Sequence, residues 1–173
     1  FSLENLSRVN TICLDKTGTL TDGSMEVESL LSYIPKDDVI RYLEEFSFAS
    51  TDDNQTSMAI KGAYRKKEVA FQSFIPFSSK TKTSSLVYMD GGRLTLGAPD
   101  YLIGKDEKAY FDFQRSASEG KRVLALSFND KTIALLLLKD NIRPSASDTI
   151  DFFYDNNVDC KIISGDNLLT LTK

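Results

Sequence analysis

Short apolar runs separated by polar turns mark most of this chain. Those of strand length, rich in β-branched or aromatic residues, cover 9–14, 69–77, 84–90, 93–97, 122–128, 132–138 and 158–163. Asp90-Gly91-Gly92 and Asn129-Asp130 separate two pairs of these runs and are typical of tight hairpins. The middle of the chain is therefore predicted to form antiparallel strands.

Helical patterns lie between these runs, and they cover 35–49, 53–66, 99–103, 106–119 and 144–154, with a last helix beginning at Asp166. Pro35 suits a first helical position, and Gly120 suits a helix end. The polar segment 15–28 is expected to lead the chain out of a first domain. Alternating strands and helices at both ends predict a parallel sheet, whereas the middle predicts antiparallel strands with helices on one side. One domain, 27–135, is thus expected to be inserted into another made of 1–26 and 136–173.

The composition excludes several classes of function but does not identify one. The chain has 173 residues, 41% hydrophobic and 27% charged, which suits one or two globular domains with real cores. A net charge of −4 argues against a nucleic-acid partner, and the absence of histidine excludes an imidazole base or a His-ligated metal in this chain. No apolar run reaches the length of a membrane span. Cys13 and Cys160 lie in strand-like runs outside any C-x-x-C pair, and they are expected to be reduced core residues.

The residues with the clearest chemistry are 15–21, which read DKTGTLT directly after the apolar run 9–14. Ligands of open α/β sheets bind just outside the carboxyl ends of strands, so Asp15 stands where chemistry is expected. A carboxylate there can attack the γ-phosphorus of ATP if Lys16, backbone N–H groups and Mg²⁺ neutralise the phosphate. The structural alternative is that Asp15 caps the helix that follows.

These seven residues match the phosphorylation motif of the P-type cation-transporting ATPases letter for letter, and the chain resembles this family over nearly its whole length. The resemblance implies an α/β fold, in which a partial haloacid-dehalogenase-like phosphorylation domain with a parallel sheet contains an inserted α+β nucleotide-binding domain on an antiparallel sheet. Segment 140–144 resembles the family's D-x-x-R-P and segment 163–167 its T-G-D-N. The resemblance assigns catalytic roles to Asp15, Lys16, Thr17, Asp140, Arg143 and Asp166, and Mg²⁺ binding to Asp15 and the Thr17 carbonyl. Asp140 and Arg143 could instead be a helix cap and a surface pair.

The inserted part carries the segments that resemble the family's ATP site, at 77–82, 96–100 and 120–125. The implied nucleotide-binding residues are Phe77, Lys82, Gly97, Arg122, Thr17, Ser164 and Gly165. Phe77 would stack on adenine, Lys82 and Arg122 would attract phosphates, and Gly97 would let the backbone approach the base. Phe77 could instead fill the core and Lys82 lie on a solvated strand face. Leu96 stands where the family has lysine and Ser57 where it usually has glutamate, so weak ATP binding is expected and the role of the glutamate stays open.

Two other functions remain as alternatives. A haloacid-dehalogenase phosphatase normally has a second aspartate two residues after the first, and Thr17 occupies that place here, so a phospho-aspartate is expected to persist. The other alternative is a non-catalytic nucleotide-binding module.

The interpretation we favour is the ATP-binding and phosphorylation headpiece of an ion-translocating ATP hydrolase. Its parent would be an integral membrane protein whose membrane segments, absent here, bind the transported cation, and this portion would lie on the cytoplasmic side. ATP and Mg²⁺ are the implied ligands. Both ends look cut, and the piece alone is expected to be monomeric and at most very weakly active.

Overall fold

The computed structural model describes residues 9–104 and 107–163. It divides into two compact units: unit 1, which comprises the chain up to Ser24 and from Asp140 onward, and unit 2, Met25–Lys139. The sequence placed the domain boundaries at 26/27 and 135/136, and the phosphorylation and nucleotide-binding roles given to the two domains stay predictions.

Unit 1 is built on a parallel pair of strands. β1 (Thr11–Asp15) lies beside β8 (Asp159–Ile163), with Ile12 opposite Cys160 and Asp15 opposite Ile163. A parallel pair needs a crossover connection, and α6 (Ala146–Asp155) lies directly before β8. The prediction of an α/β fold with a parallel sheet is thus confirmed.

The prediction of core cysteines is wrong for Cys13. Its side chain is exposed, whereas Cys160 is half-buried, and both are free thiols. Parallel sheets are buried only when layers cover both faces, and in the part of the chain that the structure describes this sheet has two strands. An apolar run therefore does not by itself guarantee burial.

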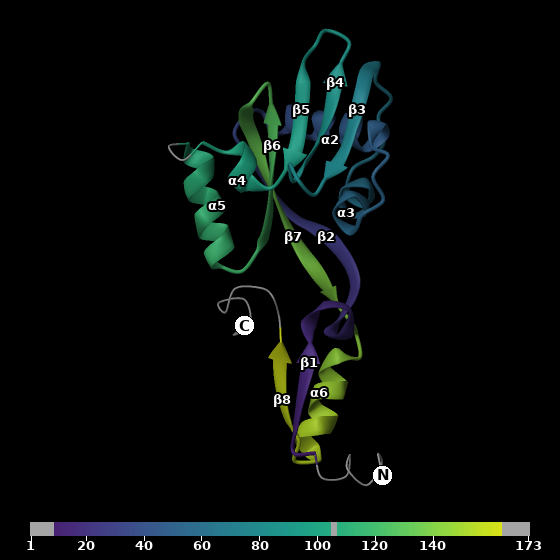
Figure 1. Cartoon of the computed structure of the whole chain (residues 1–173), viewed down its shortest axis with the longest axis vertical. Coiled ribbons are helices and arrows are strands. Elements are labelled where there is room, and N and C mark those ends of the chain that lie inside the picture. The colour runs from purple at the N-terminus through teal and green to yellow at the C-terminus, as the bar shows by residue number, and fades with distance from the viewer. Residues whose placement is uncertain (1–8, 105–106, 164–173) are drawn as a thin grey trace. The chain divides into compact units, whose positions relative to one another are not determined.

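Unit 2 holds most of a six-stranded sheet with the strand order β2-β7-β6-β5-β4-β3 (Figure 1). The pairs from β3 to β7 are all antiparallel, as predicted. The strands are β2 (Thr21–Ser32), β3 (Phe71–Ser78), β4 (Thr83–Tyr88), β5 (Arg93–Gly97), β6 (Arg122–Phe128) and β7 (Lys131–Ile142). The neighbouring strands β2 and β7 both continue past the boundary into unit 1.

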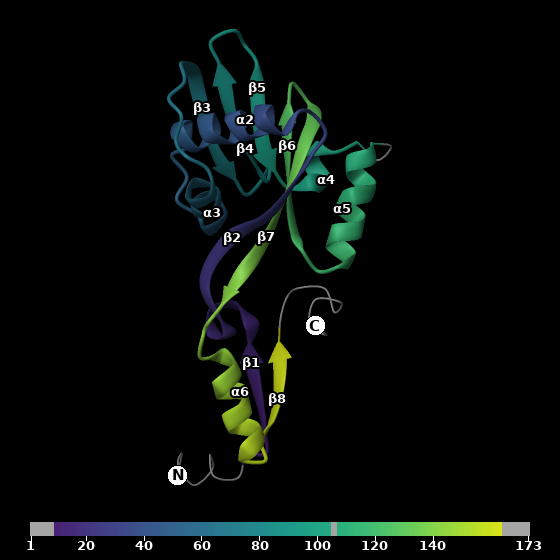
Figure 2. The ribbon, with the colours of Figure 1, turned by 180° about the vertical axis from the view of Figure 1, so that it is seen from behind.

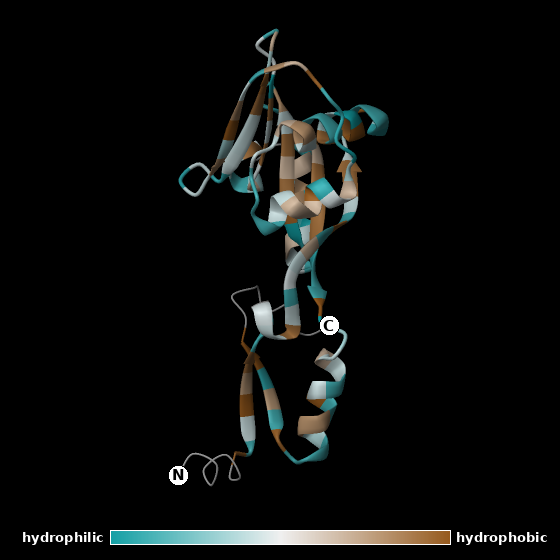
Figure 3. Cartoon of the chain, turned by 90° about the vertical axis from the view of Figure 1, so that its right-hand side faces the viewer, coloured by the Kyte–Doolittle hydropathy of each residue, from teal (hydrophilic) through white to brown (hydrophobic). Residues whose placement is uncertain are grey.

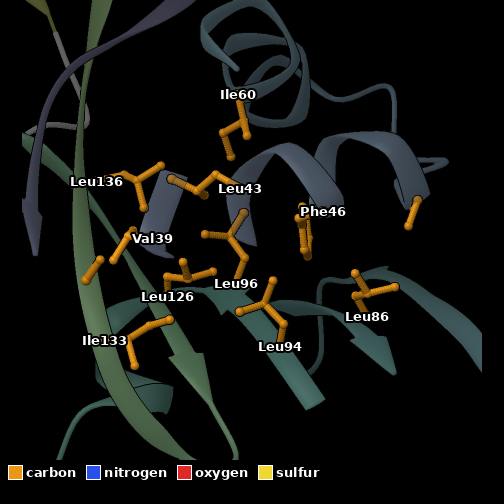
Figure 4. Close-up of a cluster of buried hydrophobic side chains, with 12 residues drawn as sticks. Val39, Leu43, Phe46, Ile60, Leu86, Leu94, Leu96, Leu126, Ile133 and Leu136 are labelled. Carbon is orange, nitrogen blue, oxygen red and sulfur yellow. The ribbon is translucent and has the colours of Figure 1, made fainter. Parts of the chain in front are cut away.

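Helices pack on both faces of this sheet, which corrects the prediction of helices on one side. The helices of unit 2 are α2 (Lys36–Ala49), α3 (Gln55–Ala63), α4 (Pro99–Leu102) and α5 (Lys108–Ser118). Residues of α2 and α3, such as Leu43 and Ile60, pack with Leu126 and Leu136 (Figure 4), and α2 crosses the strands in Figure 2. Val123, Ala125, Leu135 and Leu137 alternate with these along β6 and β7 and form a second cluster with the α4–α5 region. The apolar run of β7 supplies side chains to both clusters, and Figure 3 shows hydrophobic segments along the strands of unit 2.

The largest difference in element assignment is β2. Residues 21–28 of this strand were predicted as part of a polar exit segment and 29–32 as no element, because acidic and small residues interrupt the apolar positions. The other elements agree to within a few residues, although α3 ends at Ala63 rather than at 66. The helix predicted from Asp166 lies outside the described residues.

Candidate functional site

Asp15 is the last residue of β1, at the carboxyl end of the parallel pair, and its side chain is exposed. A π-helical turn, η1 (Lys16–Leu20), follows immediately. Gly18 within it has φ +79°, a left-handed conformation that glycine adopts without the strain of a Cβ. The chain therefore turns sharply at the strand end, which leaves the Asp15 carboxylate accessible.

Arg143 holds this turn from the other segment of unit 1. Its Nε donates to the Thr21 carbonyl at 3.0 Å, its Nη2 donates to the Gly18 carbonyl at 3.1 Å, and its backbone N–H donates to the Leu20 carbonyl at 2.8 Å. The Gly18 N–H donates to the Thr21 hydroxyl at 3.1 Å. Arg143, to which the resemblance assigns a catalytic role, thus contacts the main chain of the loop after Asp15.

Lys16 and Asp140 form an ion pair, with Nζ and Oδ2 3.1 Å apart and both side chains about a quarter exposed. The ion pair and the Arg143 contacts join both residues to the loop after Asp15, and the catalytic roles given to Asp140 and Arg143 stay predictions. Nearby, the exposed Asp22 accepts hydrogen bonds from the hydroxyl and the N–H of Ser24, which lower the pKa of its carboxyl. Unit 1 therefore gathers a cation and several acids around one loop.

Four of the residues predicted to bind the nucleotide line a single cavity of about 640 Å³, which lies wholly within unit 2: Phe77, Lys82, Gly97 and Arg122. This volume is that of a typical small-ligand site. The remaining wall comes from Phe46 of α2, the loop 52–54, the start of α3, and residues at one end of β4, β5 and β6.

The cavity joins an exposed aromatic ring to an apolar floor. Phe77, near the end of β3, is 46% exposed, which excludes the alternative that it fills the core. Leu96 is 5% exposed, and it belongs to the hydrophobic cluster under α2 while it also lines the cavity. A cavity lined by an aromatic ring and apolar side chains can take a planar ring system.

The structure adds a packing reason for Gly97, and its approach to the base stays a prediction. A Cβ on Gly97 would lie 2.4 Å from the Lys82 carbonyl oxygen and 2.8 Å from the Thr83 Cα, closer than real Cβ contacts. The space is therefore occupied by the neighbouring strand, whose Lys82 carbonyl also accepts the Ala98 N–H at 3.0 Å. Gly97 permits close approach of the turn that carries Lys82, which has φ +56°.

Two cationic side chains line the cavity from different elements. Lys82 is exposed in the turn before β4, and Arg122 is exposed at the start of β6. The Arg122 Nη1 lies 3.5 Å from the Met25 sulfur, and within 9–104 and 107–163 the guanidinium forms no ion pair with a carboxylate. Its charge is thus not neutralised by an acid of the described chain.

The segment before α3 forms the polar side of the cavity. The Asn54 side chain caps the helix by accepting the Ser57 N–H at 3.0 Å, and the Ser57 hydroxyl lies 3.2 Å from that of Ser50. Ser57 is buried, and it lines the cavity at the start of α3. The Asp52 carboxylate accepts the Phe77 N–H at 3.1 Å, a contact between residues 25 positions apart that the sequence did not predict.

The remaining predicted residues are not placed. Ser164, Gly165 and Asp166 lie outside the described residues, and for Thr17 only the backbone is described. In the described part of the chain, no three acidic or cysteine side chains gather as a metal-binding group, and no helix has the length and hydropathy of a membrane span.

Comparison with known sequences identifies one family and several relatives. Residues 9–173 match the haloacid dehalogenase-like hydrolases. The calcium-transporting ATPase CtpE of Mycolicibacterium smegmatis is 33% identical over 183 residues, which cover 98% of this chain and 23% of that protein. The probable cation-transporting ATPase exp7 of Streptococcus pneumoniae is 32% identical, over 99% of this chain and 24% of its own length. The chain thus spans about a quarter of the length of these curated relatives.

Comparison with solved structures supports the same fold. The crystal structure of a zinc-transporting PIB-type ATPase has a TM-score of 0.70 at 21% identity, covering 98% of this chain and 28% of that one. The catalytic domain of the CPx-ATPase CopB-B has a TM-score of 0.69 at 18% identity, covering 98% of this chain and 59% of that one. The resemblance to P-type ATPases found in the motifs is confirmed.

Proposed function

Because this chain belongs to the haloacid dehalogenase-like hydrolase family and its curated relatives are cation-transporting ATPases, we propose that it is the ATP-binding and phosphorylated portion of a P-type cation-transporting ATPase. The parent protein would use a phospho-aspartate to drive a cation across a membrane, with this portion on the cytoplasmic side. The observation that carries the proposal is the cavity of unit 2, where Phe77, Lys82 and Arg122 converge.

In this proposal the cavity holds ATP by its base and attracts its phosphates. Phe77 stacks on the adenine ring, and Leu96 contributes an apolar contact in place of a charge. Lys82 and Arg122 attract the phosphates, and the guanidinium of Arg122 has the five-donor geometry that suits phosphate oxygens. With one cation fewer than the family pattern, ATP binds weakly, with a dissociation constant on the order of 0.1–10 mM.

Phosphoryl transfer to Asp15 is the proposed chemical step. A carboxylate oxygen of Asp15 forms a bond to the γ-phosphorus, and the bond from that phosphorus to the β-bridging oxygen breaks, so ADP leaves with the electron pair. Lys16, kept near the strand end by Asp140, contributes positive charge. Mg²⁺ takes oxygen ligands, which the accessible Asp15 carboxylate and the Thr17 carbonyl provide, and when bound it neutralises charge on the phosphates.

The persistence of the phospho-aspartate distinguishes this proposal from a phosphatase. Thr17 occupies the position where a phosphatase of this family carries its second aspartate. Its hydroxyl cannot act as the general base that activates water at neutral pH. The intermediate is thus stable enough to couple to another part of the protein.

The phosphorylation step is tested in the full-length parent protein. Incubation with ATP and Mg²⁺ should give an acid-stable, hydroxylamine-labile phosphoprotein, and Asp15→Asn should abolish it because the amide cannot attack. Asp22→Asn, which changes an exposed carboxyl of the same unit, serves as the matched control and should keep the label. Labelling that survives in Asp15→Asn would reject Asp15 as the nucleophile.

The nucleotide site is tested on the present chain by calorimetric titration with ATP. Stacking of a base on an aromatic ring contributes roughly 1–3 kcal/mol, so Phe77→Ala should weaken binding by about ten-fold or more. Phe111→Ala removes another exposed ring, 66% exposed on α5 and outside the cavity, and should leave the affinity unchanged. Equal affinity in wild type and Phe77→Ala would refute the stacking role.

A further inference from the structure

The loop before α3 is joined to β3 through one carboxylate. Both oxygens of Asp52, Oδ1 and Oδ2, accept the backbone N–H of Phe77 at 3.1 Å. Asp52 and Phe77 line the same cavity, and Phe77 is the residue whose ring is proposed to stack on adenine. Asp52 therefore touches the backbone of the stacking residue.

The strand itself does not fix this part of β3. Among the described strands β3 lies at an edge of the sheet, and its register with β4 shifts between Ile75 and Ser78. Pro76 in the shifted stretch has no N–H to contribute to a ladder. Bulges of this kind redirect a side chain, and they weaken the pairing that would otherwise hold the backbone. The orientation of Phe77 thus depends on a contact from outside the sheet.

The backbone of Asp52 is itself held by hydrogen bonds with two residues. Its N–H donates to the Ser50 hydroxyl at 3.3 Å, and its carbonyl accepts from Lys61 Nζ at 2.5 Å. Lys61 belongs to α3, a helix whose residues Ala59 and Ile60 are buried in the core of unit 2. The carboxylate is consequently presented from a fixed support rather than from a free loop.

We propose that Asp52 is a positioning residue for nucleotide binding: it sets the position of Phe77 in the wall of the cavity and does not itself contact the base. This proposal rests on the proposed nucleotide site. It implies that the acidic segment before α3 acts through the aromatic ring in this chain, whereas the family's glutamate position is occupied here by the buried Ser57.

A double-mutant cycle measures this coupling through ATP affinity. Asp52→Ala in the wild-type background should weaken ATP binding by about three- to ten-fold, which is part of the stacking contribution. In the Phe77→Ala background the same change should alter affinity less than about two-fold, because the ring it positions is gone. Asp53→Ala removes the exposed carboxylate next along the chain, which also lines the cavity, and measures the effect of lost charge alone.

A second readout does not depend on nucleotide. Amide hydrogen exchange of Phe77 in the ligand-free chain should be faster in Asp52→Ala than in wild type, and unchanged in Asp53→Ala. If the effects of Asp52→Ala and Phe77→Ala on affinity are additive, or if Phe77 exchange is unchanged, the positioning role is overturned while the nucleotide site stands. If the wild-type chain binds no ATP, the proposed function itself fails, and the role of Asp52 in binding fails with it.

Discussion

Replacing Gly97 by alanine should destabilise unit 2 and disturb its cavity together. The added Cβ would lie 2.4 Å from the Lys82 oxygen, 2.7 Å from the Thr83 Cγ2 and 2.8 Å from the Thr83 Cα. Two of these atoms belong to the backbone, which cannot rotate away as a side chain can. To restore ordinary contact with the Lys82 oxygen, the two backbones must separate by about 1 Å, in an interior that is packed like a crystal.

The magnitude follows from the contacts that this separation affects. Overpacking of a well-packed site costs about 1–3 kcal/mol. The Ala98 N–H to Lys82 carbonyl hydrogen bond, 3.0 Å long, is stretched by the same movement and adds about 1 kcal/mol. We therefore expect a loss of about 2–4 kcal/mol in the free energy of unfolding, which lowers the Tm by roughly 6–15 °C.

The assay compares two glycine-to-alanine variants by scanning calorimetry and ATP titration. Gly62→Ala lies in α3, where a Cβ meets nothing within 4 Å, so it should raise stability by about 0.5–1 kcal/mol through helix propensity. Gly97→Ala should also weaken ATP binding several-fold because Lys82 moves, and Gly62→Ala should not. A Gly97→Ala protein as stable as wild type would refute the steric argument.

Three further changes test other parts of the molecule. Leu96→Lys buries part of a charged chain and should cost about 1–3 kcal/mol of stability, yet it should tighten ATP binding at low salt and lose that gain at high salt. Titrations at two ionic strengths decide this, and an unchanged low-salt affinity would contradict it. Arg143→Gln frees the loop after the nucleophile, so phosphoenzyme formation in the parent protein should fall about 10- to 100-fold while ATP affinity stays the same; retained phosphorylation would show that the carbonyl contacts are dispensable. Burial and the 2.7 Å hydrogen bond to Glu45 raise the pKa of Tyr88 above its ordinary 10.0, so its contribution to stability is complete below pH 10 and is lost as pH rises beyond it. Between pH 8 and 11, urea unfolding of Tyr88→Phe should therefore show a smaller loss of stability than wild type. Some loss should remain in the variant because the pKa of Tyr33 is also raised. An equal loss in both proteins would reject this role of Tyr88.

Local turn chemistry explains why the hairpins could be predicted from sequence. Asn129 and Asp130 both adopt positive φ, 47° and 63°, a conformation these residue types tolerate well. The bounds of β5 and β6 agree with the predicted runs 93–97 and 122–128 because apolar residues, turn residues and strand length all point to the same assignment.

Elements defined by distant partners could not be predicted in the same way. β2 is a strand because it lies beside β7, more than a hundred positions later, and its own composition is too polar to show it. The exposure of Cys13 depends on which layers cover a sheet, which no local pattern encodes.

In the candidate site, too, residue types could be predicted from the sequence but their contacts could not. The motifs identified Phe77, Lys82, Gly97 and Arg122, and the structure places all four around one cavity. The contacts of each residue could be known only from the fold. Gly97 makes room for a neighbouring backbone segment, and Arg143 donates hydrogen bonds to loop carbonyls. Side chains of the right type can be found from spacing, whereas their hydrogen-bond partners depend on tertiary packing.

The pairing of β2 with β7 brings the two ends of unit 2 together. Glu26 is the second residue of unit 2 and Lys139 is its last, and their carboxylate and ammonium groups lie 2.7 Å apart. A segment whose ends meet can be placed in a surface loop of another fold without stretching either partner, which is the geometric condition for a tolerated domain insertion. For the same reason 25–139 is suited to circular permutation, with a short linker joining its old ends and new termini opened in the exposed hairpin at Asp90-Gly91.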